Sequence, residues 1–575
     1  MPLQADTKVA LGGDAYRYEE KSDFKGGLNL RADQFNITHN ESPAMLNVEV
    51  DPRGGVRRRD AVAKVNATAL DNKIISLMSH YEAGQNQILV AALDPATTKS
   101  QISYNADATG NFTGPIQVGG VNAYFNTAQP PRSVTFGSAS FSGGVGRTYI
   151  VNGEMLHNDS GETTSSSLRW DGATAGAPTP DLDGSDGHFP CARYVATFAE
   201  HMWVAYTLEA GTYHKNRVRF SKSNDAENWT ATDYLEVDVG EDGDHITAII
   251  PDADRLLVFK QNSIYAIYGF SGDTWEVRNI TRTAGCREGT QPVAATAGVF
   301  FWYAEEGIYI VAYDNVAWVF ERIKPAMTYD VGQPAMTLDT APSIMWFDER
   351  LWVSVDYQSD DNISGSSQNN RRNVFVWDPS LGPTGSWTRH DINARSLLAY
   401  RPSGAEHFGI AVTSNITTVA SFDRISKLDQ NYDYDDYVGA VSEINSFYHT
   451  GWFEGNRPTF PKRWGKTRTV VLSDNPTVIV MYVYKNYDSS TALAGYSKTM
   501  SGMDTPAVWD GGTSLWDATD WQPEGTSDKY AFGRWPTIGT AQAISLRFSV
   551  SPTVSTRGKW GVTSVVSMYR TRRLR

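Results

Sequence analysis

Cysteine is almost missing from this chain of 575 residues, which contains only Cys191 and Cys286. Two cysteines do not make the disulfide framework of a small secreted domain or a cysteine-based metal set, and we interpret them as free thiols. Long apolar runs are missing too, since no stretch approaches the ~18 residues of a membrane helix. The first residues, MPLQADTKVALGGDAYRYEEK, lack the basic start and apolar core of a secretory signal, so we expect folding in a cytoplasm.

Sequence signatures of catalysis are also missing. The chain has no GxxxxGK[ST] phosphate loop, no HExxH and no GxSxG. The glycine-rich GGVGRTY at residues 143–149 leads into a strand, and a phosphate cradle needs the amides of a helix N-terminus, so we interpret it as a turn. We therefore expect a protein that is not an enzyme and has no catalytic residue, cofactor or metal. A pair of glycosidase carboxylates is defined in space and not by spacing, and that alternative stays open.

The charge balance is acidic. The chain has 51 Lys and Arg against 65 Asp and Glu, a formal net charge of −14 and a pI of about 5.2. This argues against a general nucleic-acid binder, which would carry a basic face. An acidic protein can still surround DNA if it has to let DNA slide past.

Helix signals are nearly absent, and strand signals are everywhere. Short β-branched and aromatic runs such as ILVAAL, HMWVAY, RLLVFK, VFFWYA and RLWVSVDY are bounded by turn residues. A strong strand recurs at intervals of roughly 45–60 residues, close to the length of a four-stranded propeller blade. The recurrences lie near Ile88, Thr148, Met202, Leu256, Phe301, Leu351 and Phe408. The pattern predicts an all-β protein with an irregular β-propeller of about six or seven blades.

Two flanking regions depart from this period. We predict an extended N-terminal segment over residues 1–70, the propeller over 71–430, and a C-terminal β-rich platform or assembly domain, sandwich-like, over 431–575. The C-terminal region is dense in tryptophan, which suits an aromatic core or a subunit interface. These residues are Trp452, Trp464, Trp509, Trp516, Trp521, Trp535 and Trp560.

Several acidic stretches invite a functional reading. SNDAENWT at residues 223–230 is similar to the Asp box of sialidases but has Glu227 where the box has Gly, and we interpret it as a hairpin-stabilising turn whose Trp packs between blades. Closely spaced carboxylates are also typical of Ca²⁺ sites, but the spacings here match no EF-hand loop, and we interpret these stretches as solvated turns. They contain Glu241, Asp242, Asp244 and His245; Asp181, Asp183 and Asp186; and Asp433, Asp435 and Asp436.

Three separated stretches together resemble the tail nozzle proteins of short-tailed phages, also called tail tubular protein B, and related minor tail structural proteins. They are FKGGLNLRADQFNITHNESPAMLNVEVDPRGGVRRRDAV; NRVRFSKSNDAENW with YLEVDVGEDGDHITAIIPDADRLLVFKQNSIYAIYG; and PTFPKRWGKTRTVVL with the terminal MYRTRRLR. The second is the most specific, because its order of elements agrees over more than fifty residues. The motifs are short and degenerate.

The resemblance implies a structural protein of the virion tail, made in the host cytoplasm. Such a subunit forms a ring, typically a homo-hexamer, below the portal and the tail adaptor protein. Phage genomic DNA passes through its lumen at ejection, tail fibres or spikes dock nearby, and the host cell surface is a further partner. Two alternatives stay open, a receptor- or glycan-binding minor tail protein and a glycan-degrading tail enzyme.

Under this resemblance the basic segments are candidate assembly contacts. They comprise Arg57, Arg58 and Arg59, and Arg570, Arg572, Arg573 and Arg575. The alternative reading of these segments is a solvated turn and a frayed tail.

Overall fold

The computed structural model describes a protein made almost entirely of strands. It describes residues 17–571 apart from 33–35, 67–69, 71–72, 82–85, 95–98, 107–110, 128, 138–145, 158–160, 162, 177–179, 182–188, 239–243, 272–273, 305, 328–340, 357–371, 383, 402–407, 415–421, 430–434, 437–440, 443, 456–457, 474–476, 489–491, 501–529 and 551–559. Of the described residues, 61% lie in strands and 2% in helices. The all-β prediction is confirmed.

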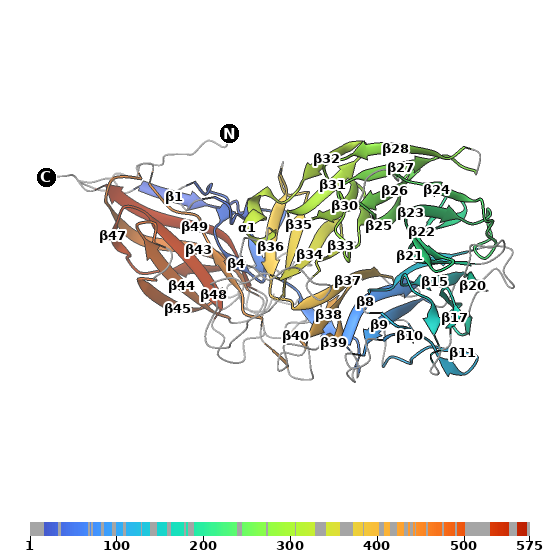
Figure 1. The fold of residues 1–575 in the computed structure, drawn as a ribbon. Coiled ribbons are helices and arrows are strands. Elements are labelled where there is room, and N and C mark those ends of the chain that lie inside the picture. Colours follow the sequence, from blue (N-terminus) through green and yellow to red (C-terminus); the bar gives the residue numbers. More distant parts are fainter. Residues whose placement is uncertain are drawn as a thin grey trace, which may run out of the picture.

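Seven sheets, called blades 1 to 7 here, follow one another along the chain, except that two short strands of blade 1 come after the first two strands of blade 2 (Figure 1). Blade 1 contains β8 (Lys73–His80), β9 (Gln87–Leu93), β10 (Ser100–Ala106), β13 (Tyr124–Phe125), β16 (Leu156–His157) and β17 (Thr163–Ser165), with a hairpin of β11 (Gln117–Val118) and β12 (Val121–Asn122) beside it. Blade 2 contains β14 (Arg132–Phe136), β15 (Arg147–Val151), β18 (Leu168–Trp170) and β19 (Ala175–Gly176). Blade 3 contains β20 (Pro180–Asp181), β21 (Phe189–Phe198), β22 (His201–Glu209), β23 (Thr212–Phe220) and β24 (Tyr234–Glu236).

The remaining four blades have four strands each. Blade 4 contains β25 (Ile246–Asp252), β26 (Arg255–Lys260), β27 (Ile264–Tyr268) and β28 (Glu276–Thr281); blade 5 contains β29 (Val293–Ala295), β30 (Gly298–Tyr303), β31 (Gly307–Ala312) and β32 (Asn315–Trp318). A 3₁₀ turn, Glu321–Ile323, and α1 (Lys324–Met327) follow blade 5. Blade 6 contains β33 (Ser343–Phe347), β34 (Arg350–Asp356), β35 (Arg372–Asp378) and β36 (Ser386–His390); blade 7 contains β37 (Ala394–Tyr400), β38 (Phe408–Ser414), β39 (Phe422–Asp429) and β7 (Ala61–Lys64).

These blades close into a ring. One strand of each blade contacts its counterpart in the next, in the order β8, β14, β21, β25, β29, β33, β37, and β37 contacts β8 in turn. This is the first strand of every blade except blade 3, where the short β20 precedes it. A buried apolar cluster crosses the last junction, where Ile410 and Ile425 of blade 7 pack with Ile88 and Val90 of blade 1. The arrangement is therefore a β-propeller with seven blades. The seven strong strands recognised in the sequence fall on the strand that follows this contact strand in each blade: β9, β15, β22, β26, β30, β34 and β38.

The strand that completes blade 7 comes from the beginning of the chain. β7 pairs with β39, joining Ala61 to Asp429 and Lys64 to Ser426. Val62 is fully buried between blades 6 and 7. Just beyond β7, the backbone N–H of Ile425 donates to Asn66 Oδ1 across 359 residues of sequence. The ring therefore closes only when the two ends of the propeller sequence have met.

Two further sheets pack face to face beside the propeller. The larger contains β1 (Arg17–Lys21), β5 (Val48–Val50), β6 (Val56–Arg58), β43 (Lys462–Ser473), β46 (Tyr530–Arg534), β47 (Gly539–Ala541) and β49 (Trp560–Thr571). The smaller contains β4 (Met45–Leu46), β42 (Phe447–His449), β44 (Thr477–Lys485), β45 (Ala494–Met500) and β48 (Ile544–Val550). Trp464 and Val562 of the larger sheet share one buried cluster with Met481 and Leu546 of the smaller, so the pair is a β-sandwich.

Residues 17–64, called the N-terminal segment from here on, do not form a region of their own. In Figure 1 the blue strands β1 and β4 lie among the red and brown strands of the sandwich. β2 (Gly27–Leu28) and β3 (Glu41–Ser42) pair with each other, and β2 contacts β36 of the propeller. The predicted division at residues 70 and 430 therefore differs from the observed pairing: the N-terminal segment is shared between both domains. Two small strands, β40 (Asp435–Asp436) and β41 (Val441–Ser442), lie in the connection after blade 7.

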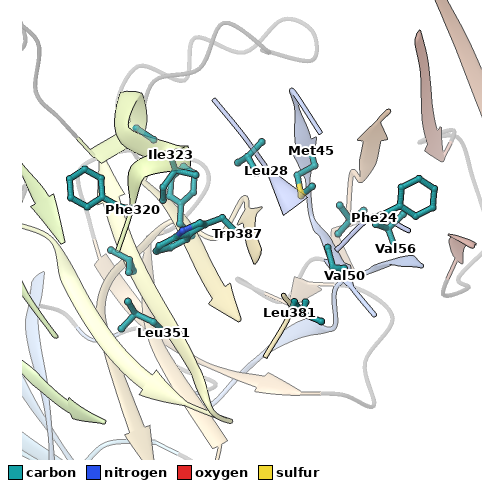
Figure 2. Close-up of a cluster of buried hydrophobic side chains, with 14 of the residues drawn as sticks. Phe24, Leu28, Met45, Val50, Val56, Phe320, Ile323, Leu351, Leu381 and Trp387 are labelled. Carbon is teal, nitrogen blue, oxygen red and sulfur yellow. The ribbon is translucent and has the colours of Figure 1, made fainter. Parts of the chain in front are cut away.

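One hydrophobic cluster runs from blades 4, 5 and 6 through the N-terminal segment into the sandwich. Figure 2 shows the part where the N-terminal segment meets the propeller, with Phe320, Ile323 and Trp387 of the propeller on one side and Leu28, Met45 and Phe24 of the N-terminal segment on the other. Hydrogen bonds also cross this boundary: the Asn47 N–H donates to Arg389 O (2.8 Å), and the Asp391 N–H donates to Asn47 Oδ1 (2.8 Å). The two domains are thus packed through the segment between them.

None of the described helices is long and apolar enough to cross a membrane.

We predict that Trp387→Ala lowers the free energy of unfolding by about 3–5 kcal/mol, because the side chain is 1% exposed and its loss leaves a cavity at this boundary. The measurement is urea unfolding of the full chain. Phe270→Ala is the control, since that ring is 82% exposed and its loss changes stability by no more than about 0.5 kcal/mol. Equal effects of the two substitutions would contradict the packing described here.

Candidate functional site

The predicted assembly arginines have different environments. Arg57 is exposed on β6 and pairs with Glu49, a carboxylate whose pKa is raised by burial, at 3.5 Å. Arg58 and Arg59 are 6% and 1% exposed. Arg59 Nε donates to Asn47 Oδ1 (2.8 Å) and Nη1 donates to Asp60 O (2.8 Å). Arg58 and Arg59 are therefore not assembly contacts, because they are buried within a single chain.

The C-terminal arginines lie at the end of β49. Arg570 is half-buried and faces Arg463 on β43. Arg572, Arg573 and Arg575 lie outside the described residues.

Strand pairing brings together further basic residues on the outer surface of the larger sandwich sheet. This basic face consists of the exposed side chains of Arg463, Lys466, Arg468 and Arg534. Arg468 stands opposite Arg534 across β43 and β46, and Arg463 stands opposite Arg570, so like charges face each other, which is unfavourable. Within the described part of the chain these four residues have no ion pair. An anionic partner would relieve the repulsion.

The basic face was not predicted from the sequence. The only sign of it in the sequence is the spacing of Arg463, Lys466 and Arg468 in KRWGKTR. Side chains alternate between the two faces of a regular strand, and this alternation would put Arg463 and Lys466 on opposite faces. A register shift between Trp464 and Thr467 moves Lys466 to the side of Arg463. Arg534 joins the face only through the pairing of β46.

The SNDAENWT turn is structural, as predicted. Trp229 is 2% exposed and packs against Phe189 with ring centroids 5.4 Å apart, in the cluster between blades 2 and 3. Glu227 reaches across to blade 2, where it accepts hydrogen bonds from Arg169 (2.7 Å) and from the Tyr149 hydroxyl (2.7 Å). The residue that departs from the Asp box therefore ties two blades together.

The acidic loop before blade 4 also has a structural role where it is described. Asp244 Oδ2 accepts from Ser263 Oγ (2.8 Å) and Oδ1 accepts from the Asn262 N–H (3.2 Å), so it holds the turn between β26 and β27. His245 lies 3.4 Å from Glu288, which also pairs with Arg193. Glu241, Asp242, Asp183, Asp186 and Asp433 lie outside the described residues, as do the side chains of Asp181, Asp435 and Asp436. The described residues contain no cluster of His, Cys, Asp and Glu suited to a metal ion.

Both cysteines are free and buried. Burial raises the pKa of the Cys286 thiol to about 11, so it stays protonated and unreactive at neutral pH.

A cavity of about 270 Å³ lies at the centre of the propeller, against the innermost strands of blades 1, 2, 6 and 7 and the start of blade 5. Among the described residues, this axial cavity is lined by two arginines, Arg132 and Arg395, and by no Asp or Glu. Arg132 of blade 2 reaches across the axis to the segment before β29: Nη1 donates to Gln291 Oε1 (2.8 Å) and Nη2 to the carbonyl oxygens of Gly289 and Thr290 (both 3.2 Å). Burial lowers the pKa of Arg132.

Comparisons with known proteins do not assign a family. No family model and no curated protein matches the chain. Among solved structures, the extracellular domain of a hybrid two-component system from B. thetaiotaomicron is 11% identical, with a TM-score of 0.34, over 65% of this chain and 40% of that one. The dihydro-heme d1 dehydrogenase NirN is 8% identical, with a TM-score of 0.30, over 64% and 70%. A glycoside hydrolase family 43 arabinoxylan arabinofuranohydrolase from Bacillus subtilis is 9% identical, with a TM-score of 0.21, over 89% and 99%.

Two of these similar structures are thus enzymes, and the chain spans 40% of the length of the first structure. At such identities and TM-scores the likenesses carry no argument about activity.

We predict that Arg59→Met lowers the free energy of unfolding by about 1.5–3 kcal/mol, because it removes hydrogen bonds from a buried charged group. Lys466→Met is the control: this side chain is exposed, and its loss changes stability by no more than about 0.5 kcal/mol. Thermal or urea unfolding of both variants measures the difference. A fully stable Arg59→Met variant would show that the guanidinium has no internal role.

Proposed function

We propose that this chain is a structural subunit of a virion tail, a nozzle-like protein of a short-tailed phage, and not an enzyme. In this role it assembles into a ring, attaches to the tail adaptor protein, and lets the genome pass through the lumen. Tail fibres or spikes and the host surface are the further partners of such a ring.

The observation that most supports this proposal is the position in the fold of the motifs that resemble nozzle proteins. The first and third stretches that resemble nozzle proteins lie far apart in the sequence, yet they come together in the larger sandwich sheet. LNVEV and GGVRRR form β5 and β6, PTFPKRWGKTRTVVL forms most of β43, and MYRT ends β49. These strands pair in the order β43, β49, β6, β5. Motifs that build one sheet together are better evidence of a shared design than motifs scattered over a fold.

The packing of the two domains suits a subunit that carries load in a tail. A continuous buried cluster joins the propeller to the sandwich, and Arg322 of the propeller binds both Glu41 (3.1 Å) and Gly26 O (2.8 Å) of the N-terminal segment. A ring built from such units keeps its lumen at a fixed width, because the domains do not hinge freely about a flexible linker.

Charge favours self-assembly through the basic face. The whole chain carries −14, whereas the basic face carries four cations without a described counter-ion. The acidic surface of a neighbouring subunit supplies the missing charge, and the alternation of basic and acidic surfaces favours a head-to-tail ring.

We predict that the full chain forms closed rings, alone or with the tail adaptor protein of the same virus, and that Arg463→Glu/Arg468→Glu shifts the population to monomers. The reason is that two attractive contacts become repulsive, and the effect weakens as salt screens the charges. Mass photometry and negative-stain microscopy measure ring size and population.

Arg278→Glu is the matched control for this experiment, since Arg278 is equally exposed but lies on the propeller. It should leave the rings intact. A wild-type chain that stays monomeric with and without the adaptor would reject the ring, and a charge-reversed variant that assembles normally would reject the basic face as its contact.

A further inference from the structure

Exposed aromatic side chains gather at the rim of the propeller formed by blades 4 and 5. Among the described residues, Phe270, Tyr313 and Trp318 are the aromatic side chains that are more than half exposed, at 82%, 88% and 52%. Phe270 follows β27 of blade 4, Tyr313 lies in the turn before β32, and Trp318 ends β32, the outermost strand of blade 5 (Figure 1). Single exposed apolar residues are normal, but large exposed rings gathered in one place mark an interaction surface.

Strand pairing shows that Trp318 stands on the side of blade 5 that faces blade 4. It lies directly opposite Tyr309 on β31, and Tyr309 lies opposite Phe301 on β30. Side chains directly opposite each other share one face of a sheet. The Phe301 ring contacts Phe259 of blade 4, with centroids 5.1 Å apart. The exposed indole therefore belongs to the junction between the two blades.

Arg255 of blade 4 holds the turn of blade 5 that carries Tyr313. Its Nη1 donates to Asp314 Oδ1 (3.0 Å) and to the Tyr268 hydroxyl (3.1 Å). Its Nη2 donates to the carbonyl oxygen of Tyr313. Phe270 comes only two residues after Tyr268, so exposed rings of both blades lie around one carboxylate. The surface is called the aromatic edge from here on and consists of Phe270, Tyr313, Asp314 and Trp318.

Two aromatic rings of these blades already bind a cation from the same chain. The Arg278 guanidinium lies 5.0 Å from the ring centroid of Tyr268, and the Lys324 ammonium lies 5.1 Å from the ring centroid of Trp318. A cation over the face of a ring is attracted by the ring's quadrupole. The two most exposed rings of the aromatic edge have no such cation within the described part of the chain.

The surroundings of the aromatic edge are acidic. Between residues 246 and 318, the exposed charged side chains among those described are four carboxylates and two guanidinium groups. Both guanidinium groups are paired with a carboxylate, Arg278 with Glu276 (2.7 Å) and Arg282 with Asp238 (3.2 Å). The Asp314 side chain is 80% exposed although one oxygen binds the buried guanidinium of blade 4. Because a carboxylate has about four acceptor positions, Asp314 has room for a second cation.

We propose that the aromatic edge binds the basic face of a second copy of this chain, with arginines of one copy stacked on Phe270 and Tyr313 of the next and paired with Asp314. The two surfaces have opposite charge, and arginine both stacks on aromatic rings and pairs with carboxylates. The proposal rests on the ring assembly proposed above and adds the surface of the neighbouring subunit. The basic face lies on the sandwich and the aromatic edge on the propeller, so the contact is head-to-tail, the type that generates rings.

The test measures ring assembly of an edge variant, Tyr313→Asn/Asp314→Asn, by mass photometry under the condition in which the wild-type chain forms rings. Asparagine keeps the turn, because Tyr313 has a φ of +54°, which asparagine tolerates, and an amide oxygen at position 314 still accepts from Arg255. We expect the chain concentration for half-assembly to rise at least about tenfold, since an interface tyrosine and a charged contact are lost.

Tyr213→Asn/Glu200→Gln is the matched control, because it makes the same kinds of change to exposed residues of blade 3. It should assemble like the wild type. Arg278→Glu should also assemble, since it adds an anionic group beside a surface that faces cations.

A one-to-one mixture of the edge variant with Arg463→Glu/Arg468→Glu tests the direction of the contact. Each chain then keeps one intact surface, so complexes should stop at two chains, about 127 kDa, twice the 63.5 kDa of one chain. Sedimentation velocity measures this at a concentration tenfold above that at which wild-type rings form. Rings in the mixture, or monomers alone, would overturn the head-to-tail contact.

The failure of this proposal can be told from the failure of the ring. A wild-type chain that stays monomeric rejects both. Normal rings of the edge variant, beside monomers of Arg463→Glu/Arg468→Glu, reject the aromatic edge alone. If the edge variant fails to fold, Phe270→Ala decides: weaker assembly supports the aromatic edge, and unchanged assembly rejects it.

Discussion

The pairing of the N-terminal segment with strands from the far end of the chain is the constraint on which the rest of the structure depends. Without β7, blade 7 has only three strands and loses its outermost one. Without β1, β4, β5 and β6, both sandwich sheets lose strands. These contacts join residues several hundred positions apart, and such non-local pairing is entropically costly and slow to form. The chain therefore completes its two domains together.

This constraint also joins the propeller to the sandwich. Asn47 sits where propeller and sandwich meet: its Nδ2 donates to Asn445 O (2.6 Å), and its Oδ1 receives Arg59 and the backbone of Asp391. The same residues keep the basic face and the axial cavity in a fixed relation, one on the sandwich and one on the propeller.

Much of the propeller was predictable from the sequence, because its strands are short, apolar and separated by turn residues. In RLLVFKQNSIYAIYG, two apolar strands and the turn between them can be recognised from the sequence alone. The structural role of the Trp229 turn is likewise indicated by its Asp and Trp residues. That the N-terminal segment contributes strands to both domains was not predictable, since the local pattern of apolar and polar residues does not indicate which distant strand pairs with the edge of a sheet. The prediction of Arg59 as an assembly contact was wrong because a run of basic residues usually indicates an exposed surface. Its guanidinium is instead buried and donates a hydrogen bond to Asn47. The axial cavity was not predictable either, because its wall combines residues of five blades that only ring closure brings together.

Hydrogen–deuterium exchange of the full chain tests the central claim most directly, through peptides that cover residues 45–64. If these strands complete the sandwich and close the propeller, their amides exchange as slowly as those of β39 and β49, with which they pair, because they open only when both domains do. Rapid exchange throughout residues 45–64, beside slow exchange in the rest of blade 7 and the sandwich, would show that both domains stand without the segment and would contradict the account.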